Sequence, residues 1–331
     1  MLYLFQAKFL INHEKDQLGV LLVNTGTPSE LNTISIRKYL KEFLLDKRII
    51  KLPKVIWFPI LYLFILPFRP IRKIKDYNKI WMDEGSPLLV YTKRLLQKLN
   101  ASESKKDAMH IDIAMRYGEP NIKKKLMIFQ EKKINRLIVV PLFPQYSFST
   151  TESIKDKVKS SIIELNWKPK INYIEEYYKE NLYIDSMVKN INNNWKKKNG
   201  KLIFSYHGLP KKYVDKGDIY YQSCIETSKL IAKKMGLQNA EYITSFHSKF
   251  GFGEWTKPYT EELLLELPQQ DVTSICVVSP SFAIDCLETL EEIAIQFKDD
   301  FLKAGGKEFK YIPCLNDQNE HVSLIEKLVT F

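Results

Sequence analysis

The chain has 331 residues, of which 45% are hydrophobic and 27% charged, with 50 Lys and Arg against 39 Asp and Glu. This length fits two domains or one large one, and so many apolar residues exclude a disordered chain. The four cysteines, at 224, 276, 286 and 314, exclude a disulfide scaffold and lack the spacing of a structural zinc or iron–sulfur site.

Two N-terminal segments bear on membrane association. Residues 1–18 contain Glu14 and Asp16 and lack an apolar core followed by small residues, so we do not expect a signal peptide. The apolar segment 49–68 fits a transmembrane helix, a buried helix, or an exposed lip that contacts a membrane. Prolines and lysines interrupt it and leave a charge-free run of about 14 residues, which is short for a span. We favour the lip.

Eight short runs rich in β-branched residues alternate with longer helical patterns. The runs cover residues 19–24, 110–115, 136–143, 171–177, 201–207, 240–246, 273–279 and 309–313. Amphipathic segments lie between them at 122–132, 153–165, 182–198, 219–234 and 285–303. Strands separated by helices predict right-handed βαβ units and parallel sheets. We therefore predict an α/β fold of two similar Rossmann-like halves, each a four-stranded parallel sheet flanked by helices, with the active-site cleft between them.

The two halves are expected to meet near residues 165–180, and we place the boundary at residue 170. Residues 1–170 then form the N-terminal half with the lip, and residues 171–331 form the C-terminal half with the acidic helix 285–303. We expect the last helix to pack back on the N-terminal half.

In open parallel sheets, ligands bind beyond the carboxyl ends of the strands, so the segments that follow the runs are the ones expected to carry chemistry. None of them contains a GxGxxG, GxxxxGK[ST], GxSxG or HExxH motif. This disfavours nucleotide binding and serine-hydrolase chemistry.

His207 ends the run 201–207 and precedes Gly208, whose missing Cβ allows a sharp turn and the close approach of a ligand. A neutral imidazole accepts a proton or binds a metal ion such as iron. The alternative is a turn histidine that only bonds the backbone.

An acidic segment follows the run 273–279. At 100° per residue, Asp285, Glu288 and Glu292 fall within about 60° of one another on one helical face. Three such carboxylates deliver a divalent cation or accept protons. The alternative is a capping box, with Asp285 at the N-cap and Glu288 three residues later.

Longer motifs join these residues into one pattern. They include WMDEGSPL (81–88), MRYGEP (115–120), PLFPQYSFSTT (141–151), SYHGLP (205–210), FGFGEWTKPYTEE (250–262) and DCLETLEEI (285–293). With them the chain resembles the ferrochelatases, enzymes that insert ferrous iron into a porphyrin, from residue 19 to residue 329. The PQYS and DCLETLEEI motifs are similar to those of the protoporphyrin-using bacterial branch of the family.

The resemblance implies site residues. His207 would face the porphyrin centre with Glu288 on the other side, both catalytic and metal-binding, and Asp285 and Glu292 would form an acidic pathway on a helix that begins with a π-turn. The implied porphyrin-contacting residues are Arg69, Tyr77, Ser86, Arg116 and Tyr117. Two departures from the family pattern are Cys286 and the loop SPSF (279–282).

The resemblance also implies substrates and location. We expect Fe²⁺ and protoporphyrin IX as substrates and protoheme as product, with release of two protons in the terminal step of heme biosynthesis. No nucleotide and no iron–sulfur cluster are expected. The enzyme would be cytoplasmic, with peripheral contact to the inner membrane. The alternatives are a cobalt or nickel tetrapyrrole chelatase, a coproporphyrin ferrochelatase, or a non-catalytic porphyrin or heme carrier.

The formal charge of +11 first suggests a nucleic-acid partner. Only seven of the basic residues are arginine, and none of those follows Arg136. Arginine is the residue favoured for reading bases and phosphates. We therefore expect a lysine-rich solvated surface and no nucleic acid, with the lysines around the lip favouring an anionic membrane.

Overall fold

The computed structural model describes residues 17–102, 109–195, 200–250 and 253–330. The N-terminal segment considered as a signal peptide lies outside them except for its last two residues, as does the end of the predicted helix 182–198.

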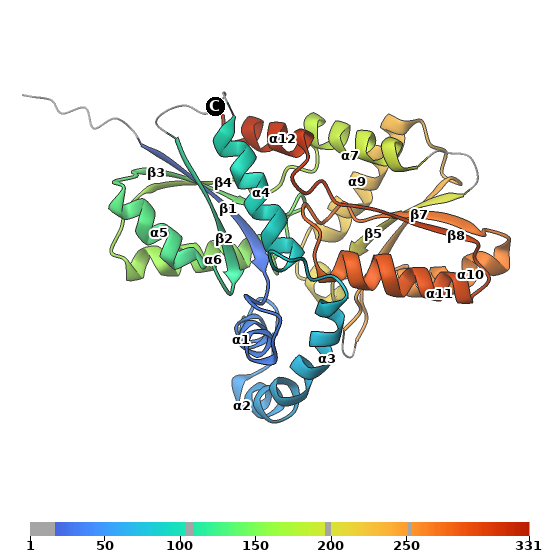
Figure 1. Cartoon of the computed structure of the whole chain (residues 1–331), viewed down its shortest axis with the longest axis horizontal. Coiled ribbons are helices and arrows are strands. Elements are labelled where there is room, and N and C mark those ends of the chain that lie inside the picture. Colours follow the sequence, from blue (N-terminus) through green and yellow to red (C-terminus); the bar gives the residue numbers. More distant parts are fainter. Residues whose placement is uncertain (1–16, 103–108, 196–199, 251–252, 331) are drawn as a thin grey trace, which may run out of the picture.

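In these described ranges, eight strands form two parallel sheets that lie side by side in Figure 1. The first has the order β2-β1-β3-β4, with β1 (Leu18–Gly26), β2 (Met109–Tyr117), β3 (Arg136–Pro141) and β4 (Lys170–Tyr173). The second repeats it as β6-β5-β7-β8, with β5 (Lys201–His207), β6 (Tyr242–His247), β7 (Ser274–Val278) and β8 (Glu308–Ile312). All eight predicted runs are strands, and the predicted fold class is confirmed. Because β4 pairs with β3, the first sheet continues three residues past the predicted boundary at 170.

Helices cover both faces of the first sheet. On one face, α4 (Pro87–Ala101) and α12 (Asn319–Val329) pack on strand residues such as Val20 and Leu22. On the other face lie α5 (Ile122–Glu131) and α6 (Thr151–Glu164). The helix α12 comes from the chain end, yet its Ile325 belongs to this core while Leu324 belongs to the core of the second sheet. It therefore joins the two halves.

The second sheet is covered in the same way. One face packs against α7 (Asn181–Asn194) and α9 (Tyr220–Met235). The other face packs against α10 (Thr260–Glu266), the 3₁₀-helix η2 (Leu267–Gln270), the π-helix η3 (Glu288–Phe297) and α11 (Lys298–Lys303). A short helix, α8 (Lys211–Val214), follows β5.

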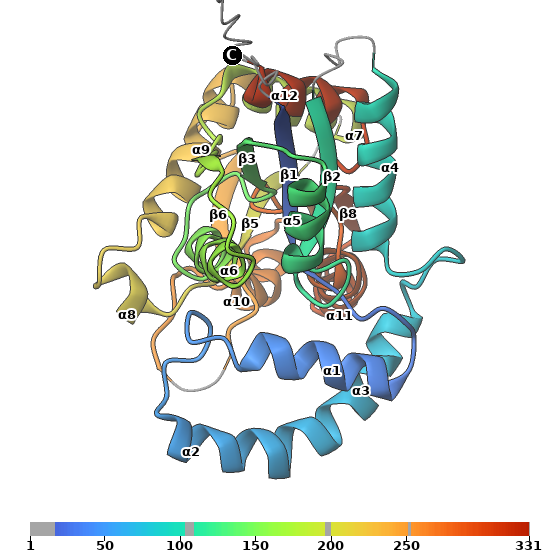
Figure 2. The ribbon, with the colours of Figure 1, turned by 90° about the vertical axis from the view of Figure 1, so that its left-hand side faces the viewer.

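The lip projects beneath both sheets (Figures 1 and 2). It consists of the loop that follows α1 (Thr33–Leu44) and of a continuous helix made of α2 (Lys54–Pro59), the π-helix η1 (Ile60–Ile65) and α3 (Leu66–Asn78). The continuous helix, Lys54–Asn78, contains an 18-residue stretch with a mean hydropathy of 1.5 and is long and apolar enough to cross a membrane by length and composition alone.

One side of the lip helix packs against the protein. Trp57, Leu61 and Leu66 are buried in a cluster with Ile36 and Leu40 of α1. The other side is apolar and exposed at Val55, Ile56, Phe58, Ile60, Tyr62, Leu63, Phe64, Phe68 and Ile71. The segment is therefore an amphipathic projection rather than an ordinary buried helix, and its contact with a membrane stays a prediction.

Gly26 fixes how β1 ends. It pairs with Tyr117 of β2 and has a φ of +112°. A Cβ at this position would lie 1.9 Å from the Tyr117 carbonyl oxygen. Only glycine combines this backbone angle with this close approach.

Gly26→Ala should lower the free energy of unfolding by about 3 kcal/mol or more, because both the φ angle and the Tyr117 backbone oppose a Cβ. Urea denaturation measures the change. Gly236→Ala is the matched control, since Gly236 also has a positive φ but an added Cβ there would meet no atom within 4 Å, and it should cost about 1 kcal/mol. Equal costs at the two positions would contradict the close-approach argument.

Candidate active site

The register of β5 on β6 sets His207 beside His247 at the carboxyl ends of both strands. Their ring centroids are 5.8 Å apart. His207 Nδ1 lies 2.8 Å from the Gly208 carbonyl oxygen, and because a carbonyl only accepts, Nδ1 is the donor. Nε2 of the half-buried ring is then left as the acceptor in the neutral form.

His247 is a core histidine that contacts His207. It is fully buried, its Nδ1 lies 2.8 Å from the Ser205 hydroxyl, and its ring stacks on Phe282. Burial, with a smaller effect of neighbouring His207, lowers its pKa well below the usual value. His247 therefore stays neutral beside His207.

Glu288 is the first residue of the π-helix η3 and is half-buried. Its charge contributes to raised pKa values of Tyr39 on α1 and Tyr77 on α3, although burial is the larger cause for both. Burial lowers the pKa of Arg69, and the charge of Glu288 partly counteracts this lowering. Glu288 thus faces the lip. The π-helix agrees with the π-turn that the resemblance implied, and such turns are frequent at functional sites.

Glu292 lies one turn further along η3. Its Oε2 accepts a 2.5 Å hydrogen bond from the Ser248 hydroxyl, and the Ser248 backbone N–H donates to Glu261 Oε1 at 3.2 Å. Burial raises the pKa of Glu292 to about 7, with Glu288 and Glu261 acting in the same direction. Burial also raises the pKa of Glu261, which the charge of His207 lowers slightly. A line of titratable groups therefore runs from His207 through Glu261 and Glu292 to Glu288.

Sequence reasoning missed Ser248 and Glu261. Ser248 follows the end of β6, so the strand-end rule selected its segment but not the residue. Its left-handed φ of +61° aims the backbone N–H and the hydroxyl at two different carboxylates. Glu261 lies near the start of α10, where nothing local distinguishes it from an ordinary first-turn carboxylate.

Asp285 does not share a helical face with the other two carboxylates, and that expectation was wrong. It precedes the helix, and η3 has π geometry rather than 100° per residue. The capping box is also wrong, because the Asp285 N–H donates to Asn316 Oδ1. The buried carboxylate accepts hydrogen bonds from Thr289 Oγ1, Tyr311 OH and Asn316 Nδ2. These contacts anchor the start of η3, and a part for Asp285 in an acidic pathway stays a prediction.

Three of the predicted porphyrin-contacting residues lie on or near the lip. The Arg69 guanidinium lies 4.7 Å from the centre of the ring of Phe250, a residue of the C-terminal half. Tyr77 is buried, with its ring edge-on to Trp81. Ser86 is buried at the start of α4 and accepts a 2.7 Å hydrogen bond from Thr27 Oγ1. The charge of Glu288 contributes to the pKa shifts of both Arg69 and Tyr77.

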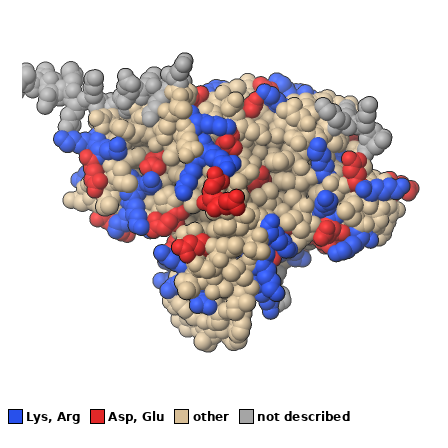
Figure 3. All heavy atoms as spheres, viewed as in Figure 1, with Lys and Arg blue, Asp and Glu red and all other residues tan. Residues whose placement is uncertain are grey.

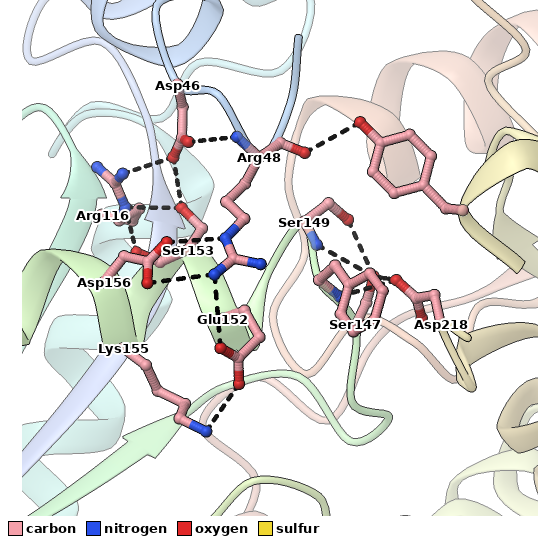
Figure 4. Close-up of polar contacts among 12 residues, drawn as sticks. Asp46, Arg48, Arg116, Ser147, Ser149, Glu152, Ser153, Lys155, Asp156 and Asp218 are labelled. Atoms are coloured by element: carbon pink, nitrogen blue, oxygen red, sulfur yellow. Dashed lines mark hydrogen bonds and ion pairs between the residues drawn. The ribbon is translucent and has the colours of Figure 1, made fainter. Parts of the chain in front are cut away.

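The other two, Arg116 and Tyr117, contact Asp46 at the start of the loop after α1 (Figure 4 labels Asp46 and Arg116). Asp46 Oδ2 accepts from Arg116 Nη2 at 2.5 Å, from Tyr117 OH at 2.7 Å and from Ser153 Oγ at 2.5 Å. The Asp46 side chain is 6% exposed. The polar groups of Arg116 and Tyr117 are therefore engaged in holding the start of the lip.

The other end of the lip is tied to the acidic helix. Lys79 Nζ lies 2.7 Å from Glu291 Oε1, and the Glu291 side chain is 2% exposed. Leu287, directly before η3, packs against the lip core. The lip is thus attached to the helix that carries Glu288.

Within the described ranges, no group of three or more His, Cys, Asp and Glu side chains is arranged to hold a metal ion. The four cysteines are buried and free.

Comparison with known proteins decides the family. The ferrochelatase family model matches residues 17–331. The chain belongs to the ferrochelatase family. It is 41% identical over 320 residues to the ferrochelatase of Pseudoalteromonas atlantica, covering 96% of this chain and 89% of that one. It is 39% identical to the ferrochelatase of Vibrio cholerae, covering 96% and 98%, and 42% identical to that of Francisella tularensis, covering 94% of each. Such an enzyme takes a porphyrin and ferrous iron as substrates.

Solved structures agree with the fold. The chain is similar to SirB from Bacillus subtilis with Fe³⁺, with a TM-score of 0.57, 10% identity and coverage of 94% and 93% of the two chains. It is also similar to the sirohydrochlorin chelatase SirB in complex with cobalt, with a TM-score of 0.53, 10% identity and coverage of 93% and 91%. At this identity the likeness confirms the two-half chelatase fold alone.

Asp46→Asn should lower the free energy of unfolding by about 3 kcal/mol, because it leaves the half-buried Arg116 without its counter-charge. Thermal melting measures stability, and limited proteolysis after residue 46 measures loosening of the lip. Asp156→Asn is the matched control. It removes a more exposed partner of Arg48 and should cost less than about 1 kcal/mol. Equal effects of the two variants would contradict the anchor.

Glu292→Gln should stabilise the protein at pH 8 by about 1–2 kcal/mol and leave it unchanged at pH 5. The raised pKa means that the folded state binds this proton more tightly than the unfolded chain, so stability is lost as the pH rises through about 7. Denaturant titrations at both pH values measure the difference. Glu266→Gln controls for the loss of one exposed carboxylate. If Glu292→Gln changed the free energy of unfolding equally at pH 5 and pH 8, the raised pKa of Glu292 would be contradicted.

Proposed function

We propose that this ferrochelatase inserts Fe²⁺ into protoporphyrin IX between His207 and Glu288, releasing two protons in the terminal step of heme biosynthesis. Protoporphyrin is proposed over coproporphyrin because the motifs PQYS (144–147) and DCLETLEEI (285–293) are similar to those of the protoporphyrin-using branch of the family. The observation that carries the catalytic assignment is the hydrogen bond from His207 Nδ1 to Gly208, which leaves Nε2 free to accept a proton.

The reaction exchanges two pyrrole protons for one metal ion. We propose that His207 Nε2 accepts the two pyrrole protons in turn as the metal–nitrogen bonds form, passing the first proton to Glu261 before it takes the second. Neutral His247 packs against the ring and holds its orientation. Glu261, whose Oε2 is buried without a partner, is the proposed acceptor of the proton that His207 passes on.

On the other side, Glu288 supplies a negative charge for a divalent cation that is losing its water. Glu292 is the proposed preceding group on that path, since it titrates near neutral pH and therefore releases its proton readily when a cation approaches. Asp285 is proposed only as the anchor that sets where η3 begins.

Porphyrin contacts are proposed for Arg69, Tyr77 and Ser86, which come from the lip and from the start of α4. Arg69 is the proposed partner of a propionate, because its guanidinium is only half-buried and stacks on an exposed Phe250. Arg116 and Tyr117 act through Asp46 by positioning the lip.

The proposed location is the cytoplasm, with the lip touching the inner membrane. The exposed apolar side of the lip helix supports this contact, because large exposed apolar patches on a helix are typical of surfaces that bind a membrane. Figure 3 shows the tip of the projection largely free of charged residues, with Lys and Arg gathered above it on both sides.

His207→Ala should abolish anaerobic iron insertion while porphyrin binding, followed by fluorescence quenching, largely survives. Glu288→Gln should lose at least about two orders of magnitude in rate, the range of a positioned acid–base group. Glu291→Gln is the matched control on the same helix, because its carboxylate pairs with Lys79 and should affect mainly stability. Near-normal turnover of the His207 variant would overturn the assignment, and retained activity of the Glu288 variant with a lowered melting temperature would assign Glu288 a structural role.

A further inference from the structure

A groove with a cavity volume of about 550 Å³ lies between α1 and the lip helix. Its walls combine apolar and cationic side chains, namely Ile34, Arg37, Lys38, Lys41, Tyr62, Leu66 and Pro67. It lies outside the line of titratable groups that runs from His207 to Glu288, and the proposed reaction does not use it.

The three cations of the groove come from one stretch of α1. Arg37 Nε donates to the Leu66 carbonyl oxygen at 3.0 Å, and Lys41 Nζ lies 5.4 Å from the centre of the Tyr62 ring. Within the described part of the chain, no carboxylate lies within ion-pairing distance of Arg37, Lys38 or Lys41. Three exposed cations without counter-charges beside an apolar floor are complementary to an anion that carries an apolar tail.

The distance of the groove from the exposed side of the lip helix also suits the binding of a lipid headgroup. The lip helix exposes Leu63 and Phe64 on its outer side, while its inner side packs on α1. Packed helices lie about 8–10 Å apart, and an interfacial helix buries its apolar face about 5–10 Å into the boundary between headgroups and acyl chains. With the lip helix embedded to that depth, the cations of α1 reach the level of the lipid phosphates. Figure 2 shows α1 above the lip helix, alongside part of it and running in the opposite direction.

We infer that this groove is a binding site for the headgroup of an anionic phospholipid. Arg37, Lys38 and Lys41 hold the phosphate, and Leu66, Pro67 and Ile34 contact the start of the acyl chains. The inference rests on the proposed membrane contact and deepens it, because it names the lipid class and its site. A free phosphate would use the cations but leave the apolar walls uncovered.

The test is co-sedimentation of the full chain with vesicles of pure phosphatidylcholine and of an equal mixture with phosphatidylglycerol. The wild type should prefer the mixed vesicles. The double variant Lys38→Gln, Lys41→Gln should lose about thirtyfold in binding to them, because both lysines would contact the bound phosphate and each would contribute about 1 kcal/mol. The matched control, Lys54→Gln with Lys75→Gln, removes equal charge from exposed lip positions outside the groove and should lose about threefold. Melting temperature and iron insertion into detergent-solubilised porphyrin should stay unchanged in both.

The outcomes separate this inference from the proposals on which it rests. Equal losses in the two double variants would overturn the groove site and leave membrane contact standing, because the attraction would then come from the whole lip surface. Failure of the wild type to bind either vesicle would overturn both the groove and the membrane contact. Neither result bears on iron insertion, which is measured without a membrane.

Discussion

The in-register pairing of β5 with β6 is the interaction on which the site depends. It places His207 and His247 at the same edge of a parallel sheet and leaves Gly208 to bond the His247 carbonyl oxygen at 2.7 Å. A slip by one residue would turn His207 to the other face of the sheet. Because β7 lies on the other side of β5, the segment that follows β7 returns to the same edge and delivers η3 with Glu288. The two proposed catalytic groups therefore depend on strand order rather than on proximity in the sequence.

The lip is the second requirement, and it is held at both ends. At its start Asp46 is bonded to Arg116, while the Tyr213 hydroxyl donates to the Arg48 carbonyl oxygen at 3.1 Å (Figure 4). At its end Lys79 pairs with the buried Glu291 of η3. The same projection thus presents an apolar face to solvent and contributes Arg69 and Tyr77 to the neighbourhood of Glu288. This arrangement suits an enzyme whose substrate is itself flat and largely apolar, since the porphyrin and a membrane then meet the protein at one surface.

The fold followed from the sequence because β-branched runs and amphipathic segments are local patterns, and all eight runs became strands. His207 followed from the rule that ligands bind beyond strand ends. The acidic helix was only half-predicted, since regular helical spacing placed Asp285 beside Glu288, whereas a π-helix and the bonds from Asn316 and Tyr311 place its carboxylate elsewhere. Ser248 and Asp46 escaped notice because their partners lie 44 and 70 residues away, and no local pattern encodes such pairing.

The central claim is that this chain is an iron-inserting enzyme that uses protoporphyrin. The most direct measurement is an anaerobic insertion assay with the full chain, with Fe²⁺ supplied to protoporphyrin and coproporphyrin side by side and metalloporphyrin followed by absorbance. The account predicts rapid formation of protoheme and much slower use of coproporphyrin. Preference for coproporphyrin would contradict the proposed substrate, and tight porphyrin binding without insertion of iron into either would contradict the catalytic roles of His207 and Glu288.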